Sequence, residues 1–383
     1  MFNQLSSGAR EELIQLGIIG KASASQIAPI PPVQSIPEEQ RNPSPLHRES
    51  LTDNHQILQG ATSTEQSSQS AGPPPTHVPQ PDNHQILPGA TSTEQSTQSA
   101  GPPPTHVPQF EHVGFDAHFH PDRLHSIMVK SGNPLREDPI IPCKVVGGVL
   151  NLCDPATYMG PEFEQVLQGA SSPSWKLAVG IHPKHASRYN EREWQAMIRH
   201  LTHSRVVGIS EVGLDYSVSS RKWGKQRALF HRIPSLGTLG HVLIMHLRGE
   251  ASDPRGWVVH NYALDLLKRK CVPTQRVHLH CFCGDEEQVR AWTHAFPNAY
   301  FGLSGLLSPS RSSETTVRAV RAIPSGRLLL ETDSPHLCVT PRGTYNTPAY
   351  LADVGQMAAQ VRGCSLRDLL ALTHINALRL YGP

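Results

Sequence analysis

Six residues that are able to bind a metal ion end, or directly follow, short apolar runs that resemble β-strands. They are His118 and His120 in FDAHFHPDR, Glu211 in VVGISEVGLDY, His246 in VLIMHLRG, His280 in VHLHCFCG and Asp333 in LLLETDSPH. Imidazole nitrogens and carboxylate oxygens are the donors that hold catalytic divalent cations in many enzymes. Four histidines and two carboxylates in equivalent positions therefore indicate a hydrolytic metalloenzyme.

Each of these residues, taken alone, also has a purely structural explanation. Two imidazoles on one strand face can bond to backbone carbonyls, and His246 or His280 can be a hydrogen-bonded core histidine. Glu211 and Asp333 can each cap a following turn. His278 lies on the same apolar run as His280 and is a rival ligand. The joint pattern of six residues favours a metal site over these separate explanations.

Two further residues are candidates for binding substrate. His182, in GIHPKHA, follows an apolar run and either holds a phosphate or a substrate water, or stabilises a turn. Arg248 stands two residues after His246, and its planar guanidinium can pair with a phosphate or form a salt bridge at the rim. Asp215 and Tyr216 follow Glu211 and are expected to orient it or to line the same pocket.

The residues that must position this chemistry alternate between strand-like and helix-like segments. Eight strands are expected at 113–118, 144–150, 176–181, 205–211, 241–246, 276–280, 299–303 and 327–332. Helical patterns occupy 190–203, 255–270, 285–296 and 313–323, with Asn190 and Asp285 placed to cap helix starts. Such alternation predicts an α/β fold, the (β/α)8 TIM barrel of the metal-dependent hydrolase type.

A barrel of this kind would bring the six candidate ligands together. Active sites of these barrels form at the carboxyl ends of the strands, where side chains converge across the mouth. His118 and His120 are two residues apart, so that on an extended segment both point to one face. The expected strands one, four, five, six and eight would then contribute ligands to one pocket.

Composition divides the chain into two parts. Residues 1–110 hold 16 of the 34 prolines and no Trp or Tyr, and they contain a tandem repeat of 29-residue period, at 53–80 and 82–109. A segment this poor in apolar residues cannot offset its ordering entropy, which predicts a disordered low-complexity tail. The short pattern EELIQLGII near the start could form one helix. Residues 111–383 are ordinary globular sequence and are expected to form the barrel, while the sequence does not indicate a partner for the tail.

Charge and cysteine content limit the possible partners. Residues 1–110 contain four Lys/Arg against nine Asp/Glu, whereas residues 111–383 contain 30 against 23. A moderately basic catalytic part suits an anionic substrate such as nucleic acid, although this support is weak. The seven cysteines are scattered, and Cys281 and Cys283 are expected to be buried thiols. No membrane span or signal peptide is apparent, which predicts an intracellular protein, cytoplasmic or nuclear.

The motifs, in this order, resemble those of the TatD family of metal-dependent deoxyribonucleases. The resemblance rests on FDAHFH, GIHP, EVGLDY, VLIMHLRG, LHCFCG, LLLETDSP and the closing INALRLYG, and it covers 111–383. The whole chain most resembles a eukaryotic TatD-domain protein with an added disordered N-terminal region. The resemblance implies hydrolysis of phosphodiester bonds, often as a 3′ to 5′ exonuclease on DNA and sometimes on RNA.

The resemblance also implies two divalent metal ions, Mg²⁺ or Mn²⁺, with Zn²⁺ as an alternative. His118, His120 and Asp333 would hold the first ion, His246 and His280 the second, and Glu211 would bridge them. Asp333 would also accept a proton from the attacking water, so that Asp333 and Glu211 are the catalytic residues.

The sequence departs from the family pattern at three positions, and none of them is a ligand. Ser210 stands where the family usually has Gly, and Gly249 replaces the usual acidic residue. Pro234 falls inside the expected fourth helix (225–240) and should break or kink it, which makes the placement of His246 uncertain.

Two other functions remain open at this stage. An amidohydrolase acting on C–N, lactone or phosphotriester bonds would use the same barrel, but many such enzymes bridge their metals with a carboxylated lysine, and here Glu211 stands at that position. A binding protein without catalysis is the other alternative, and the retention of all six ligands argues against it.

Overall fold

The computed structural model describes residues 111–131, 139–170, 172–339 and 345–382. The expected tail at 1–110, with its repeat and its candidate N-terminal helix, lies outside these residues. Within the described part, no helix is long and apolar enough to cross a bilayer.

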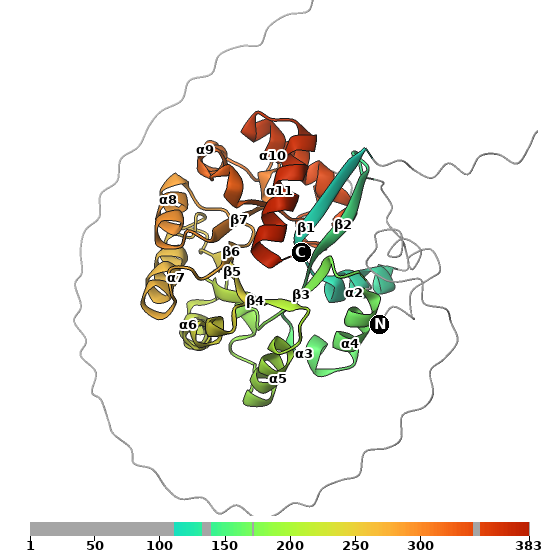
Figure 1. Cartoon of the computed structure of the whole chain (residues 1–383). Coiled ribbons are helices and arrows are strands. Elements are labelled where there is room, and N and C mark those ends of the chain that lie inside the picture. Colours follow the sequence, from blue (N-terminus) through green and yellow to red (C-terminus); the bar gives the residue numbers. More distant parts are fainter. Residues whose placement is uncertain (1–110, 132–138, 171, 340–344, 383) are drawn as a thin grey trace, which may run out of the picture. The chain divides into compact units, whose positions relative to one another are not determined.

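Eight parallel strands form one sheet whose order follows the chain from β1 to β8, which confirms the predicted (β/α)8 barrel (Figure 1). The strands are β1 (His112–Phe119), β2 (Cys143–Leu152), β3 (Trp175–Val179), β4 (Val206–Asp215), β5 (Val242–Arg248), β6 (Val277–Leu279), β7 (Ala299–Leu303) and β8 (Leu328–Leu330). All eight apolar runs became strands because both faces of such a sheet are buried, by helices outside and by side chains within.

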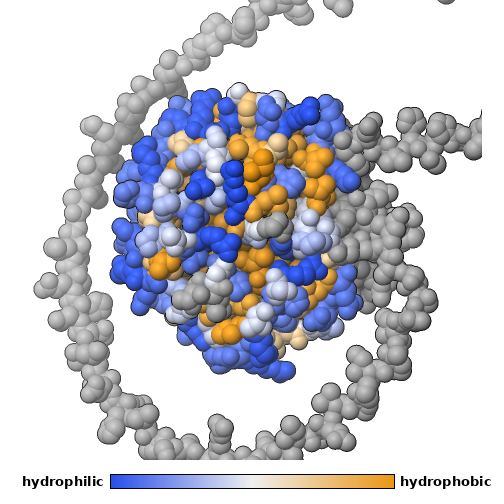
Figure 2. Space-filling view, in the orientation of Figure 1, coloured by the Kyte–Doolittle hydropathy of each residue, from blue (hydrophilic) through white to orange (hydrophobic). Residues whose placement is uncertain are grey.

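The connecting helices surround the strands as a ring. They are α2 (Pro121–Ser131), α3 (Pro155–Met159), α4 (Glu162–Gly169), α5 (Glu191–Leu201), α6 (Trp223–Arg232), α7 (Trp257–Lys270), α8 (Glu286–Ala295), α9 (Glu314–Ala322), α10 (Leu351–Arg362) and α11 (Leu366–Tyr381). Polar residues cover much of this ring on the face shown in Figure 2, as expected for helices that pack by one side. Asn190 and Asp285 cap α5 and α8 with complete capping boxes, which confirms both predicted helix starts.

Pro234 ends the fourth predicted helix without disturbing the strand that follows it. α6 stops at Arg232, and a 3₁₀ segment, Pro234–Leu239, replaces the expected last turns. A proline lacks the N–H that an α-helix needs and its ring collides with the preceding turn, so the break is local. β5 still begins at Val242 and carries His246 into the sheet.

The barrel is closed where β1 meets the segment that follows β8. The amide of Asp333 donates to the carbonyl of His118 at 3.0 Å, and the amide of His120 donates to the carbonyl of Ser334 at 2.8 Å. His118 is thereby joined by a backbone hydrogen bond to Asp333, over 200 positions away, and His120 is joined to the next residue, Ser334. The same hydrogen bonds therefore close the barrel and bring His118 and Asp333 together.

Two expected strand ends are corrected by the structure. β4 continues to Asp215 and β5 to Arg248, so Glu211 and His246 lie within their strands rather than at the ends. The ladder between these two strands shifts register between Ile209 and Val212. A comparable shift in β1 lies between Asp116 and Phe119. An extra residue in one strand re-aims the side chains beside it, so these irregularities turn His118 and Glu211 toward the barrel mouth.

Candidate metal centre

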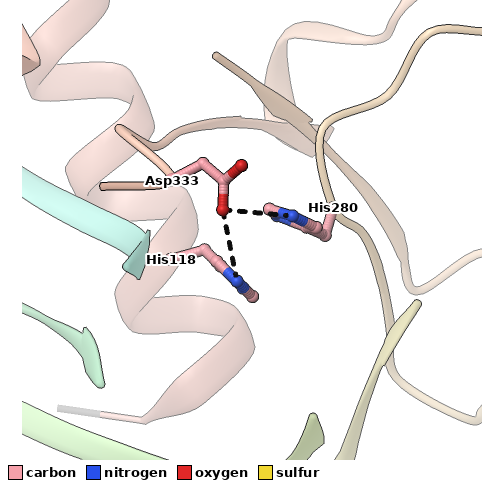
Figure 3. Close-up of side chains that lie close together, drawn as sticks. All are labelled: His118, His280 and Asp333. Carbon is pink, nitrogen blue, oxygen red and sulfur yellow. Dashed lines mark ion pairs between the residues drawn. The ribbon is translucent and has the colours of Figure 1, made fainter. Parts of the chain in front are cut away.

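The structure brings all six predicted ligands into one buried cluster. His118 Nε2 lies 3.3 Å from His120 Nε2. Asp333 Oδ1 lies 3.4 Å from His120 Nε2, 3.5 Å from His280 Nε2 and 3.9 Å from His118 Nε2, and Figure 3 shows the convergence of His118, His280 and Asp333. The rings of His118 and His280 are stacked with centroids 3.7 Å apart.

The two oxygens of Glu211 face different sets of imidazoles. Oε1 lies 3.2 Å from His120 Nε2 and 4.0 Å from His118 Nε2. Oε2 lies 2.8 Å from His246 Nδ1 and 3.7 Å from His280 Nε2. A carboxylate in this position is able to bridge two neighbouring cations, one at each oxygen.

The donor atoms fit divalent cations. Burial lowers the pKa of His118 well below its usual value, so this ring is neutral and presents a lone pair. Burial opposes ionisation of Glu211, but its contacts with His120 and His246 hold its pKa well below the usual range. Asp333 Oδ1 is buried and accepts no hydrogen bond from any described residue. Buried imidazole nitrogens and carboxylate oxygens that converge on one point are the arrangement that a metal ion stabilises.

Residues behind the ligands hold the imidazole rings in place. Asp215 Oδ2 lies 3.0 Å from His246 Nε2, on the side of the ring away from Glu211. Glu331 Oε1 lies 3.2 Å from His280 Nδ1. A carboxylate behind a ligating imidazole fixes its tautomer and makes it a stronger donor. Asp215 was expected near this site. Glu331 was not predicted to contact a ligand, and its only signal in the sequence is its position two residues before Asp333.

Cys153 is the contact that the sequence did not indicate. Its thiol donates to Glu211 Oε1 at 3.2 Å, while Arg123 Nη2 donates to the same sulfur at 3.0 Å. Cys153 directly follows β2, which carried no predicted ligand. All seven cysteines are free thiols, which confirms the absence of a disulfide framework.

His182 enters the cavity with a defined tautomer. Its Nδ1 accepts a hydrogen bond from the amide of Lys184 at 3.0 Å, so in the neutral ring the proton resides on Nε2. Burial lowers the pKa of His182 well below its usual value, which keeps the ring neutral. The Nε2–H points toward Glu211 Oε2 at 3.8 Å. This side chain therefore offers a hydrogen-bond donor rather than a lone pair to whatever occupies the site.

His278 is not part of the metal cluster. Its Nδ1 lies 2.6 Å from the Tyr381 hydroxyl and its Nε2 lies 3.0 Å from Glu331 Oε2, deep in the barrel. The C-terminal end of α11 thus covers the barrel below the site. His278 lies in β6 and His280 directly follows the strand. Of these two candidate ligands, His280 faces the mouth of the barrel.

All residues of the cluster except His118 line an open cavity of about 580 Å³. Three cationic side chains, Arg123, Lys184 and Arg248, stand on the same wall. Arg248 is exposed and forms no hydrogen bond or ion pair through its guanidinium with any described residue. A cavity with these cations above a cation-binding cluster suits a polyanionic ligand.

A parallel barrel with this donor set at its mouth defines the class of metal-dependent hydrolases. A family model described as "TatD related DNase" matches residues 115–382. The chain belongs to the TatD-related DNase family, which confirms the resemblance seen in the motifs.

Curated relatives support the assignment. The chain is 28% identical over 276 residues to the human "3'-5' RNA nuclease TATDN2", covering 70% of this chain and 35% of the relative, so it spans about a third of that protein's length. It is 28% identical over 253 residues to the Escherichia coli K12 "3'-5' ssDNA/RNA exonuclease TatD", covering 64% of this chain and 92% of the relative.

Solved structures share the fold. The Escherichia coli K12 TatD homologue YJJV aligns with a TM-score of 0.56 at 18% identity, covering 70% of this chain and 98% of that one. A TatD family hydrolase from Entamoeba histolytica aligns with a TM-score of 0.50 at 17% identity, covering 63% and 86%.

Proposed function

We propose that the protein is a divalent-metal-dependent nuclease that hydrolyses phosphodiester bonds of DNA, with RNA as a second substrate, acting as a 3′ to 5′ exonuclease. The observation that carries this proposal is the placement of Glu211, whose two oxygens face separate groups of imidazoles. The names of the human and bacterial relatives, which act on RNA and on single-stranded DNA or RNA, support the substrate class.

In this proposal the cluster holds two ions, Mg²⁺ or Mn²⁺, with Zn²⁺ as the alternative that four imidazoles would also accept. His118, His120 and Asp333 would hold one ion, His246 and His280 would contribute to the other, and Glu211 would bridge them. When bound, the ions lower the pKa of a water molecule and stabilise the attacking and leaving oxygens.

Side chains of the protein would accept the proton and bind the phosphate. Asp333 takes up the proton of the attacking water on its carboxylate, which already lies among the imidazoles. His182 donates its Nε2–H to a non-bridging phosphate oxygen, and Arg248 pairs with a phosphate through its unoccupied guanidinium. Burial strengthens the interactions of Asp333 and His182, whereas Arg248 acts from an exposed position.

The proposal is tested with end-labelled single-stranded DNA and RNA, in Mn²⁺ or Mg²⁺ and after chelation. We expect stepwise loss of nucleotides from the 3′ end, and a decrease in rate of at least about a hundredfold in Glu211→Gln and in Asp333→Asn. Asp265→Asn, which changes an exposed carboxylate on α7, serves as the control. Wild-type protein that binds metal but releases no nucleotide from either substrate contradicts the proposal.

The two alternative functions predict different outcomes. An amidohydrolase would cleave C–N, lactone or phosphotriester substrates and leave oligonucleotides intact. A protein that only binds would retain oligonucleotides without cleaving them. The expected intracellular location, cytoplasmic or nuclear, stays a prediction that fractionation of cells would test.

A further inference from the structure

A second cavity, of about 360 Å³, opens beside the catalytic cavity. The two cavities share the wall residues His246, Arg248, His280 and Leu337, so a ligand anchored at the metal cluster extends directly into the second one. A volume of this size lies within the range of about 300 to 1,000 Å³ of small-molecule sites.

Apart from His246 and His280, the side chains of the described residues that line the second cavity are mainly apolar or cationic, and none is a carboxylate. Leu306 and Leu337 line it together with Pro254, Cys281 and Cys283. Apolar surface of this kind favours a flat, weakly polar group over water. The catalytic cavity, in contrast, is lined by imidazoles and carboxylates.

Arg311 lines this cavity, and one nitrogen of its guanidinium, Nη1, already forms hydrogen bonds. Its Nη1 lies 3.2 Å from the carbonyl of Gly305, 3.3 Å from Ser308 Oγ and 3.1 Å from the carbonyl of Cys338. Its Nη2 and Nε donate to no described residue. An arginine fixed by one nitrogen is preorganised to donate hydrogen bonds from its other two nitrogens to a ligand.

We propose that this cavity binds the base and sugar of the nucleotide whose 5′-phosphate lies at the metal cluster. The inference rests on the proposed function and extends it to a subsite. The base packs against Leu306 and Leu337, Arg248 lies beside the 5′-phosphate on the wall that the two cavities share, and Arg311 donates to the 3′-hydroxyl of the sugar. None of the described residues that line the cavity is Asn, Gln, Asp or Glu, so no amide or carboxylate side chain there distinguishes adenine from thymine.

The proposal is tested by binding of reaction-product analogues to the full, Mn²⁺-loaded chain. Calorimetry compares deoxyadenosine 5′-monophosphate with 2-deoxyribose 5-phosphate, which has the same phosphate and sugar but no base. We expect the nucleotide to bind about five- to tenfold more tightly, the lower end of the effect of packing one base. Thymidine 5′-monophosphate should bind within about twofold of the adenine nucleotide.

Leu306→Ala should abolish most of the difference between nucleotide and sugar phosphate. Val272→Ala, which shortens an exposed apolar side chain elsewhere, should leave the difference unchanged. Equal binding of nucleotide and sugar phosphate to the wild-type chain overturns the proposal, as does a difference that Leu306→Ala leaves intact.

A second comparison tests Arg311. The analogue 2′,3′-dideoxyadenosine 5′-monophosphate lacks only the 3′-hydroxyl of deoxyadenosine 5′-monophosphate. Arg311→Gln should therefore weaken binding of deoxyadenosine 5′-monophosphate about tenfold while changing binding of the dideoxy analogue little. Arg318→Gln is the matched control, because Arg318 lies on the surface of α9 in ion pairs with Glu286 and Glu314. Equal losses for both ligands, or none, overturn the role of Arg311. These measurements need no turnover, so they separate failure of the subsite from failure of the nuclease.

Discussion

The carboxylate of Asp215 lies 3.0 Å from Nε2 of His246, while Nδ1 of the same ring lies 2.8 Å from Glu211. His246 is therefore held between two carboxylates, one facing the cavity and one behind. Hydrogen bonds from Ser217, whose amide lies 3.0 Å away, fix Asp215 in turn. Removing Asp215 would leave the imidazole free to rotate and to change tautomer.

We accordingly expect Asp215→Ala to weaken metal binding by about ten- to a hundredfold, with the fold retained. Calorimetric titration of Mn²⁺ into the metal-free chain measures the affinity, and circular dichroism checks the fold. Asp265→Ala provides the comparison. Unchanged affinity in a folded Asp215→Ala protein would mean that the contact with Asp215 is not needed to position His246.

Cys153 should act through Glu211 rather than on the substrate. Loss of the thiol in Cys153→Ala removes a hydrogen-bond donor to Glu211 and leaves a small gap, so we expect about tenfold weaker Mn²⁺ binding. Cys153→Ser retains a donor at nearly the same position and should stay within about threefold of wild type. A serine variant as weak as the alanine variant would show that sulfur itself, and not the hydrogen bond, matters.

The sequence predicted the strands but not the contacts between distant elements, and the reason is physical. Apolar runs predicted all eight strands, because burial on both faces leaves a signal in each run separately. The register shift beside Glu211 and the extension of β4 to Asp215 leave no such signal, since they arise from pairing between strands. The contacts of Glu331 and Cys153 likewise join elements distant in sequence, which no local pattern records.

Chelation should lower the stability of the folded chain. The cluster gathers buried carboxylates and lone pairs that only the folded protein brings together, so ions bind the native state preferentially. At a free Mn²⁺ concentration of about 100 times Kd, each site adds about 2.7 kcal/mol to the free energy of unfolding. Thermal melts with and without Mn²⁺ measure the difference, which Glu211→Gln should largely remove. Superimposable melts of the wild-type chain would argue against a metal site.

His260 should make stability depend on pH, independently of the metal centre. Burial lowers its pKa to about 4, and its Nδ1 accepts a hydrogen bond from Trp292 Nε1 at 3.1 Å. The unfolded chain, with a pKa of about 6.5, binds a proton more readily than the native state between these values. Stability from this residue is complete above pH 6.5 and falls by about 3 kcal/mol as the pH decreases toward 4.

Urea unfolding between pH 7 and pH 4.5 measures this loss. His260→Gln keeps an acceptor for Trp292 but cannot titrate, so its stability should fall less steeply with decreasing pH. Parallel curves for the two proteins would assign the acid sensitivity to other groups.

Gly180 separates β3 from the His182 segment at a point where the backbone of Ser210 passes directly beside it. A methyl group at this position would overlap the carbonyl of Ser210, the residue before Glu211. Gly180→Ala must therefore displace β4, at a cost of about 3 kcal/mol, and should weaken Mn²⁺ binding at the same time. Gly326→Ala is the matched control, because open space surrounds that position, and it should change stability by no more than about 0.5 kcal/mol. If Gly180→Ala is destabilised but binds Mn²⁺ normally, the packing of β3 against β4 does not position Glu211.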